Sequence, residues 1–165
     1  MTDINKNIDP SSDARTPLAL SVVVPVRNEA DNVAPLVSEI SAALDGQWDF
    51  EIVYVNDGST DDTAGALATL MKTNNRLRHI RHAQSCGQSC AVRSGVRAAR
   101  GAIIVTLDGD GQNNPAFLPA LVRAVEQGGD KVGLAAGQRV GRKDTGFKKV
   151  QSRIANAVRN AVLRD

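Results

Sequence analysis

The chain has 165 residues and a mass of 17.5 kDa, with 42% hydrophobic and 23% charged residues, which is typical of one soluble globular domain and unlike disordered or fibrous proteins. Its two cysteines, Cys86 and Cys90, have no second pair for a tetrahedral zinc site or a disulfide framework, so we expect reduced thiols. No apolar run is long enough to cross a bilayer, so we expect no membrane-spanning segment within these residues.

The net charge of +2 hides an uneven distribution along the chain. Residues 1–138 carry a balance of −4, whereas residues 139–164 hold eight basic residues and one acidic residue. A basic segment of this kind is typical of proteins that meet phosphate, nucleic acid or an anionic membrane. Residues 1–17 are polar and lack the apolar core of a signal peptide, so we expect a disordered leader there.

Strand and helix patterns alternate along the rest of the chain. Val-rich or apolar runs predict strands, the first ending at Pro25, and apolar residues at helical spacing predict helices between them. The predicted strands are 18–25, 50–57, 77–82, 102–108 and 131–139, and the predicted helices are 33–46, 58–74, 87–101 and 115–128. Such alternation predicts an α/β fold with a mostly parallel sheet covered on both faces.

Polar residues follow four of the predicted strands where these strands end. Ligands of open parallel sheets bind at this edge, beside the loops that lead into helices. The residues that the topology gathers there are Asn28, Glu29, Asp57, Asp108, Asp110, Gln112 and Arg139.

The stretch DGDG ends the fourth of these strands with two carboxylates, Asp108 and Asp110, separated only by Gly109. Carboxylates held this close raise each other's pKa unless a cation neutralises them. Mg²⁺ or Mn²⁺ takes oxygen ligands from carboxylates and substrate phosphates, and Gln112 adds a neutral oxygen. The pattern therefore predicts a metal site for a diphosphate, with an unliganded acidic turn as the alternative.

Three other common ligand loops are excluded. An EF-hand loop that began at Asp108 would have Pro119 in place of its twelfth-position Glu. No glycine-rich dinucleotide fingerprint follows the first strand, and the chain has no Walker-type phosphate loop.

Four segments together resemble glycosyltransferase family 2, the inverting nucleotide-sugar enzymes of the GT-A fold. They are residues 21–33, 51–63, 86–115 and 135–144. Within that family the chain is most similar to the polyprenyl-phosphate branch, the dolichol-phosphate mannose synthase type, because Gln112 and Pro115 follow the metal motif. The resemblance implies a Rossmann-like, mostly parallel sheet flanked by helices.

The resemblance also implies roles for individual residues. Those implied to border or bind the donor are Pro25, Arg27, Asn28, Glu29, Val55, Asp57, Asp108, Gly109, Asp110, Gln112 and Arg139. Among them, Glu29 would lie near the ribose, while Val55 and Asp57 would hold the base. Asp108, Asp110 and Gln112 would bind the metal, and Asp110 and Arg139 would be the catalytic residues, with Arg139 neutralising phosphate.

The chain departs from the family pattern at some of these positions. Arg27 stands where an aromatic residue is frequent, Asn56 stands where an Asp is frequent, and residues 84–91 replace a more glycine-rich loop. Simpler roles also remain open: Asn28 as a helix cap, Asp57 as a turn residue and Arg139 as a solvated charge. We interpret His79 and His82 as structural.

The implied reaction transfers a sugar from a GDP- or UDP-sugar to a polyprenyl phosphate, an acceptor that is ionised at neutral pH and needs no strong general base. The expected location is the cytoplasmic face of a membrane, where residues 146–165 would form a basic amphipathic helix after a donor-binding domain at 18–145. The alternatives are a saccharide hydroxyl acceptor, or a truncated, non-catalytic module whose acceptor side is missing. A nucleic-acid partner is not expected, because the basic stretch is short and the domain before it is acidic.

Overall fold

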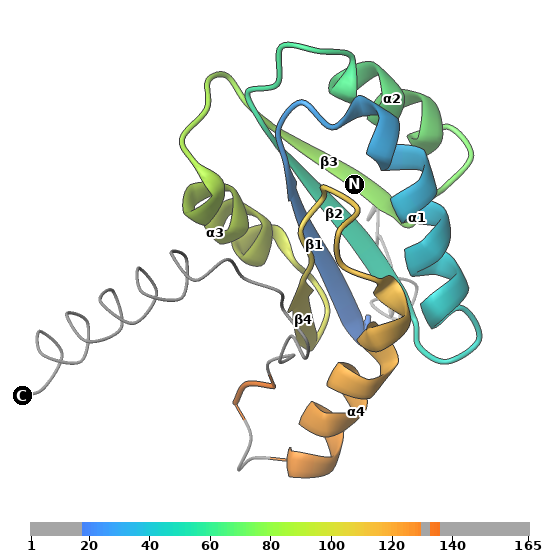
Figure 1. Cartoon of the computed structure of the whole chain (residues 1–165). Helices are drawn as coiled ribbons and strands as arrows, with labels where there is room; N and C mark the ends of the chain where they lie inside the picture. Colours follow the sequence, from blue (N-terminus) through green and yellow to red (C-terminus); the bar gives the residue numbers. More distant parts are fainter. Residues whose placement is uncertain (1–17, 130–132, 136–165) are drawn as a thin grey trace, which may run out of the picture. The chain divides into compact units, whose positions relative to one another are not determined.

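The structure, a computed structural model, describes residues 18–129 and 133–135 (Figure 1). All of them belong to one compact unit of the chain. The predicted leader, most of the predicted strand 131–139, Arg139 and the predicted basic helix 146–165 lie outside the described residues.

Four strands form one sheet, and every neighbouring pair is parallel. The strands are β1 (Leu20–Val26), β2 (Phe50–Asp57), β3 (Leu77–His82) and β4 (Ile103–Thr106), in the spatial order β3-β2-β1-β4. The helices are α1 (Ala30–Leu44), α2 (Thr63–Met71), α3 (Gln88–Ala98) and α4 (Leu118–Gly128), with a 3₁₀ turn η1 (Pro115–Phe117) before α4. The predicted α/β fold with a parallel sheet is confirmed.

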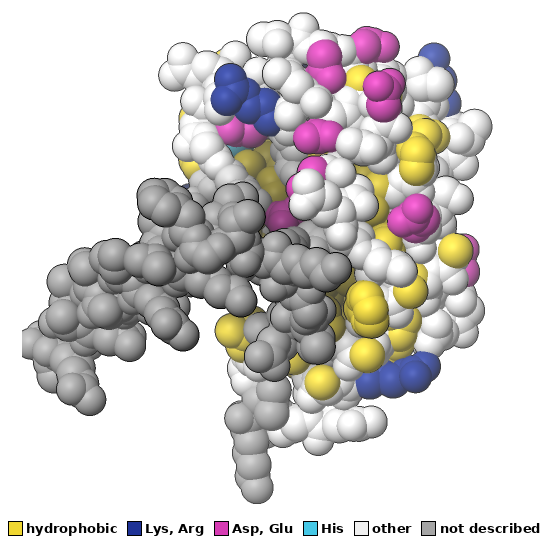
Figure 2. Space-filling view, viewed as in Figure 1, with side chains coloured by type: hydrophobic (Ala, Val, Ile, Leu, Met, Phe, Trp, Pro, Cys, Tyr) yellow, Lys and Arg dark blue, Asp and Glu magenta, His cyan; other side chains and the backbone are white. Residues whose placement is uncertain are grey.

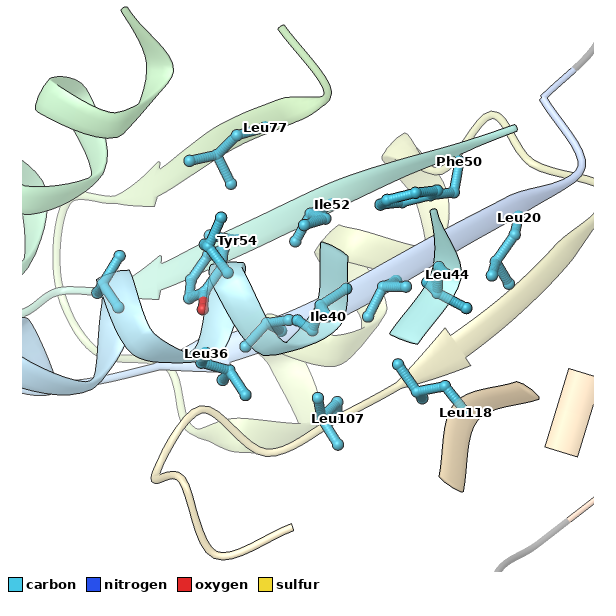
Figure 3. Packing of buried hydrophobic residues seen from close by; sticks show 14 of the residues in the cluster. Leu20, Leu36, Ile40, Leu44, Phe50, Ile52, Tyr54, Leu77, Leu107 and Leu118 are labelled. Carbon is cyan, nitrogen blue, oxygen red and sulfur yellow. The ribbon is translucent and has the colours of Figure 1, made fainter. Parts of the chain in front are cut away.

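The two central strands are buried along their whole length, as their continuous apolar sequences predict. On one face, side chains of α1, α2 and α4 pack against alternate residues of β1 and β2, and Figure 3 shows Ile40 and Leu44 of α1 among them. On the other face, Ala91 of α3 packs on Val23, Val53 and Val55. Helices therefore cover both faces of the sheet.

Pro25 marks the place where β1 and β4 part. Leu107 N still donates to Val23 O across 3.0 Å, but no residue pair follows Val23 and Thr106 in this ladder. In a strand, every second residue turns its backbone N–H and C=O groups to the same neighbouring strand. Val23 faces β4, so Pro25 is the next residue of β1 to face it. Proline has no N–H to donate, so the ladder cannot continue there. The strand predicted for 102–108 therefore ends at Thr106, which frees Asp108 for the loop.

Helix α1 begins at Ala30, three residues earlier than predicted, because a distant loop satisfies its first N–H groups. Glu29 N donates to Thr63 Oγ1 at 3.0 Å, and Ala30 N donates to Asp61 Oδ2 at 3.2 Å. Unpaired N–H groups at a helix start need such acceptors. This pairing ties the end of β1 to the segment after β2.

Candidate functional site

A pocket of about 340 Å³ opens at the carboxyl ends of β1, β2 and β4. Parallel sheets of this kind bind ligands at this edge, so the pocket lies where the topology predicts a site. Acidic side chains gather over the upper part of the described surface in Figure 2. Seven of the donor-site residues predicted from the sequence line the pocket: Pro25, Arg27, Glu29, Asp57, Asp108, Gly109 and Asp110.

Position 109 must be glycine because there is no room for a side chain there. A Cβ atom at this position would lie 2.1 Å from Val26 Cγ1 and 3.0 Å from Pro25 O. Any larger residue would therefore push the loop away from the end of β1. The glycine lets the backbone of the acidic motif pack directly on β1, which brings both flanking carboxylates into the pocket.

The two carboxylates of this motif differ in how they are held. Asp108 Oδ1 accepts a hydrogen bond from Gln88 Nε2 at 2.7 Å, and Asp108 Oδ2 accepts one from Asn113 Nδ2 at 3.2 Å. Asp110 is exposed, and its Oδ1 accepts from Gln112 N at 3.0 Å. Asp108 is thus oriented by neighbours on two sides, while Asp110 faces solvent with an oxygen that accepts no hydrogen bond from the described residues.

Asp57 lies at the end of β2 and is only 4% exposed. Its Oδ1 accepts from His82 Nδ1 at 2.7 Å and Cys86 N at 2.9 Å, and its Oδ2 accepts from Ser85 Oγ at 2.7 Å and Gly87 N at 2.8 Å. Burial by itself would raise the pKa of Asp57, but the four hydrogen bonds outweigh it and hold this pKa well below its ordinary value.

The Asp57 carboxylate is therefore ionised at neutral pH and fastens the loop before α3 to the sheet. Each of its oxygens already accepts two hydrogen bonds, so a nucleobase N–H would have to replace or share one of them. The geometry makes Asp57 an anchor for this loop, a role that the sequence alone did not reveal.

Asn28 has a different role from the helix cap that its position suggested. Its φ of 58° places it in the left-handed region, and α1 has no side-chain cap. Asn28 Oδ1 instead accepts from Thr60 N at 2.8 Å, while Asn28 N donates to Ser59 Oγ at 2.9 Å. The helix-cap interpretation is wrong, and Asn28 joins two loops at the rim without lining the pocket.

Two further predicted residues lie apart from the pocket. Val55 is fully buried in the cluster beneath α3 and does not line the pocket, so its implied role beside the base stays a prediction. Gln112 is exposed and does not line the pocket, although its backbone holds Asp110.

The interpretation of His82 as structural fits its contacts. Its Nδ1 pairs with Asp57, and its Nε2 lies 2.9 Å from Ser94 Oγ on α3. Both cysteines are free thiols, as the sequence predicted, and both are exposed.

The charges around the pocket explain what it can bind. Within the part of the chain that the structure describes, four carboxylates line it, those of Glu29, Asp57, Asp108 and Asp110, against the one guanidinium of Arg27. An anionic diphosphate would meet net repulsion there without a further cation. Carboxylate oxygens are ligands that Mg²⁺ and Mn²⁺ accept, so Asp108 and Asp110 suit such an ion.

Among the described residues, no helix is both long and apolar enough to cross a membrane.

Known proteins are similar to this chain in sequence. A dodecaprenyl-phosphate galacturonate synthase of Rhizobium johnstonii is 38% identical over 144 residues, which cover 84% of this chain and 41% of that protein. An undecaprenyl-phosphate 4-deoxy-4-formamido-L-arabinose transferase of Edwardsiella ictaluri is 36% identical over 149 residues, covering 89% and 45% of the two chains. The chain thus spans less than half the length of these relatives.

A solved structure supports the same fold. Glucosyl-3-phosphoglycerate synthase from Mycobacterium tuberculosis, in complex with Mn²⁺, UDP and glucosyl-3-phosphoglycerate, matches with a TM-score of 0.53 and 29% identity. The match covers 64% of this chain and 39% of that one. Residues 21–164 match the family described as Glycosyl transferase family 2, and with this pocket on a GT-A-like sheet the chain belongs to that family.

Proposed function

We propose that this chain carries the donor-binding part of a metal-dependent, inverting glycosyltransferase that moves a sugar from a nucleotide sugar to a polyprenyl phosphate. The observation that carries the proposal is the pocket in which Asp108 and Asp110 meet Arg27, Glu29 and Asp57 at the edge of a parallel sheet. The two relatives, both named as transferases or synthases acting on a polyprenyl phosphate, support the acceptor class.

In this proposal the nucleotide lies along the end of β1. Pro25 and Arg27 border it, Glu29 faces the ribose, and Arg27 offsets part of the diphosphate charge. Asp57 acts through the loop that it anchors, and Ser85 and Gly87 of that loop line the pocket beside it. Arg139, outside the described residues, would add a second cation for phosphate.

The residues of the acidic motif fit a hard divalent cation. Asp108 and Asp110 would hold Mg²⁺ or Mn²⁺, with Gln112 close in sequence, and Gln88 and Asn113 keep Asp108 in place. When bound, such an ion would neutralise the diphosphate and act as a Lewis acid toward the departing nucleotide. The M. tuberculosis relative, which holds Mn²⁺ and UDP, supports this chemistry.

An acceptor phosphate oxygen would attack the anomeric carbon from the face opposite the diphosphate. The new C–O bond forms as the bond to the nucleotide breaks, so the configuration inverts. Because the acceptor is already ionised, no carboxylate has to remove a proton. The basic residues of 139–164 would suit the anionic surface of the cytoplasmic membrane face.

Two alternatives remain distinct from this proposal. A saccharide hydroxyl acceptor would require a general base. A non-catalytic module would bind the nucleotide sugar without transferring its sugar.

Calorimetric titration with UDP and with GDP, with and without Mn²⁺, tests the donor site. We expect Mn²⁺-dependent binding that falls by about 100-fold in Asp110→Asn, since one of two charged ligands is lost. Glu39→Gln, an exposed carboxylate change on α1 away from the pocket, should bind as wild type. A folded chain that binds neither nucleotide would contradict the proposal.

A transfer assay then separates the enzyme from the module. Sugar transfer to undecaprenyl phosphate in detergent would identify an active transferase. Nucleotide binding without transfer to either a polyprenyl phosphate or a saccharide would identify the module.

A further inference from the structure

We propose that Asp57, His82 and Cys86, with Cys90 beside them, form a second metal site that takes a soft divalent cation such as Zn²⁺. This site is chemically distinct from the all-oxygen pair Asp108 and Asp110. It does not depend on the proposed transferase activity.

Three side chains from three parts of the fold carry the proposal. A carboxylate oxygen of Asp57, a ring nitrogen of His82 and the sulfur of Cys86 all lie within 4.8 Å of one another. Zinc bonds of about 2.0–2.3 Å in a tetrahedron bring ligand atoms within about 4 Å of one another. Cys86 is exposed and its Sγ makes only a weak contact of 3.4 Å with Gln84 O, so a side-chain rotation can close the difference.

Two of the ligands stand on rigid elements. Asp57 ends β2 and His82 ends β3, and the two residues are partners in the parallel ladder. Their side chains already meet, with Asp57 Oδ1 2.7 Å from His82 Nδ1. A cation that takes both atoms as ligands would replace this one hydrogen bond and leave the strands where they are.

The other ring nitrogen of His82 is held as it is in most metal sites. His82 Nε2 lies 2.9 Å from Ser94 Oγ on α3. A ligating histidine almost always pairs its second nitrogen in this way, and the pair fixes the ring toward the metal. The Nδ1 atom is thereby presented to Asp57 and Cys86.

Cys90 supplies a candidate for the fourth position. It lies in the first turn of α3, close enough to Cys86 to influence the pKa of that thiol. Desolvation, Cys90 and the Asp57 carboxylate all raise the pKa of the Cys86 thiol. A dication placed among these groups would reverse the repulsion, as metal binding deprotonates a coordinating thiol. Thiolate and imidazole ligands favour Zn²⁺ over Mg²⁺.

Titration of the reduced full chain with Co²⁺, followed by displacement with Zn²⁺, tests the site. We expect a thiolate-to-cobalt charge-transfer absorption that disappears on adding Zn²⁺. Cys86→Ser should weaken this absorption, and Cys86→Ser combined with Cys90→Ser should abolish it. His82→Asn removes a direct ligand and should weaken Zn²⁺ binding by about 100-fold, since even a group that only supports a ligand contributes about 10- to 100-fold.

Two matched variants separate this site from its surroundings. His79→Asn, on the same strand but outside the cluster, and Asp110→Asn, in the acidic motif, should both keep the cobalt absorption. A folded wild-type chain without the absorption, or a chain with both Cys86→Ser and Cys90→Ser that retains it, would overturn the proposal. Cys86 is exposed, so its substitution tests the site even if His82→Asn fails to fold.

Discussion

The side-chain amide of Gln88 donates a hydrogen bond to Asp108 Oδ1 across 2.7 Å, which joins the first turn of α3 to the acidic motif after β4. The loop directly before α3 is in turn fastened to the end of β2, because Cys86 N and Gly87 N donate hydrogen bonds to the Asp57 carboxylate. One short segment therefore positions two carboxylates of the pocket.

Replacing Gln88 tests this link. Gln88→Ala should weaken Mn²⁺-dependent UDP or GDP binding by about tenfold, because an orienting partner of a metal ligand contributes that much. The unfolding free energy should change little, since Gln88 is exposed. Calorimetry on Gln88→Ala and on Ser89→Ala, an exposed neighbour on α3, makes the comparison. Equal binding by both variants would remove Gln88 from the site.

The Asp57 network predicts a dependence of stability on pH. The folded-state pKa of Asp57 lies well below its unfolded value, so its contribution is complete above the unfolded pKa of about 3.9 and is lost as the pH falls below it. Asp57→Asn should lower the unfolding free energy at neutral pH by about 2–3 kcal/mol, the net worth of hydrogen bonds to one charged group. Urea unfolding at neutral and acidic pH should show a smaller loss on acidification in the variant.

Glu51 provides a matched control at the opposite end of β2. It is 3% exposed and accepts from Ser21 Oγ, Arg78 Nη1 and Arg100 N at 2.7–2.8 Å. Glu51→Gln should destabilise the fold but leave nucleotide binding unchanged, whereas Asp57→Asn should affect both. If the two variants lose the same binding affinity, the effect of Asp57 on the pocket is only global stability.

Gly109→Ala tests whether space, and not backbone freedom, is needed in the acidic motif. The added methyl would lie 2.1 Å from Val26 Cγ1, so we expect a loss of stability of about 1–3 kcal/mol, as overpacking produces, together with weaker nucleotide binding. Val26→Ala in the same chain should restore part of both. Gly111→Ala is the contrasting variant, because Gly111 has a φ of 70° and meets nothing closer than 3.5 Å. Alanine at this φ should cost about 1–2 kcal/mol of backbone strain, and adding Val26→Ala should not reduce this loss of stability.

Asn28 predicts a contrast between two small substitutions. Asn28→Ala loses the hydrogen bond from Thr60 N. It also places alanine at φ 58°, in the left-handed region that asparagine tolerates better. We therefore expect it to destabilise the fold by about 1–2 kcal/mol. Asn28→Gly loses the same bond but tolerates the backbone, so thermal unfolding should place it between Ala and wild type. Equal destabilisation by Ala and Gly would assign the whole effect to the hydrogen bond.

Local patterns in the sequence determined the type of fold and the place of the acidic motif. Apolar runs predicted β1 and β2 because a strand buried on both faces needs apolar residues throughout. Asp108 and Asp110 could be placed at a strand end because parallel strands bring their carboxyl ends to one edge. These inferences need only neighbouring residues and the periodicity of the elements.

Only the tertiary structure decided which polar groups meet. His82, Ser85 and Gln88 carry no periodic signal, and their partners stand 20–28 residues away along the chain. The same holds for Val55, whose burial depends on α3 covering that face. Two cysteines alone could not predict the zinc site proposed above, but the ladder between β2 and β3 brings Asp57 and His82 together beside Cys86. Hydrogen bonds and metal sites depend on distances in space, which chain folding creates between residues that the sequence keeps apart.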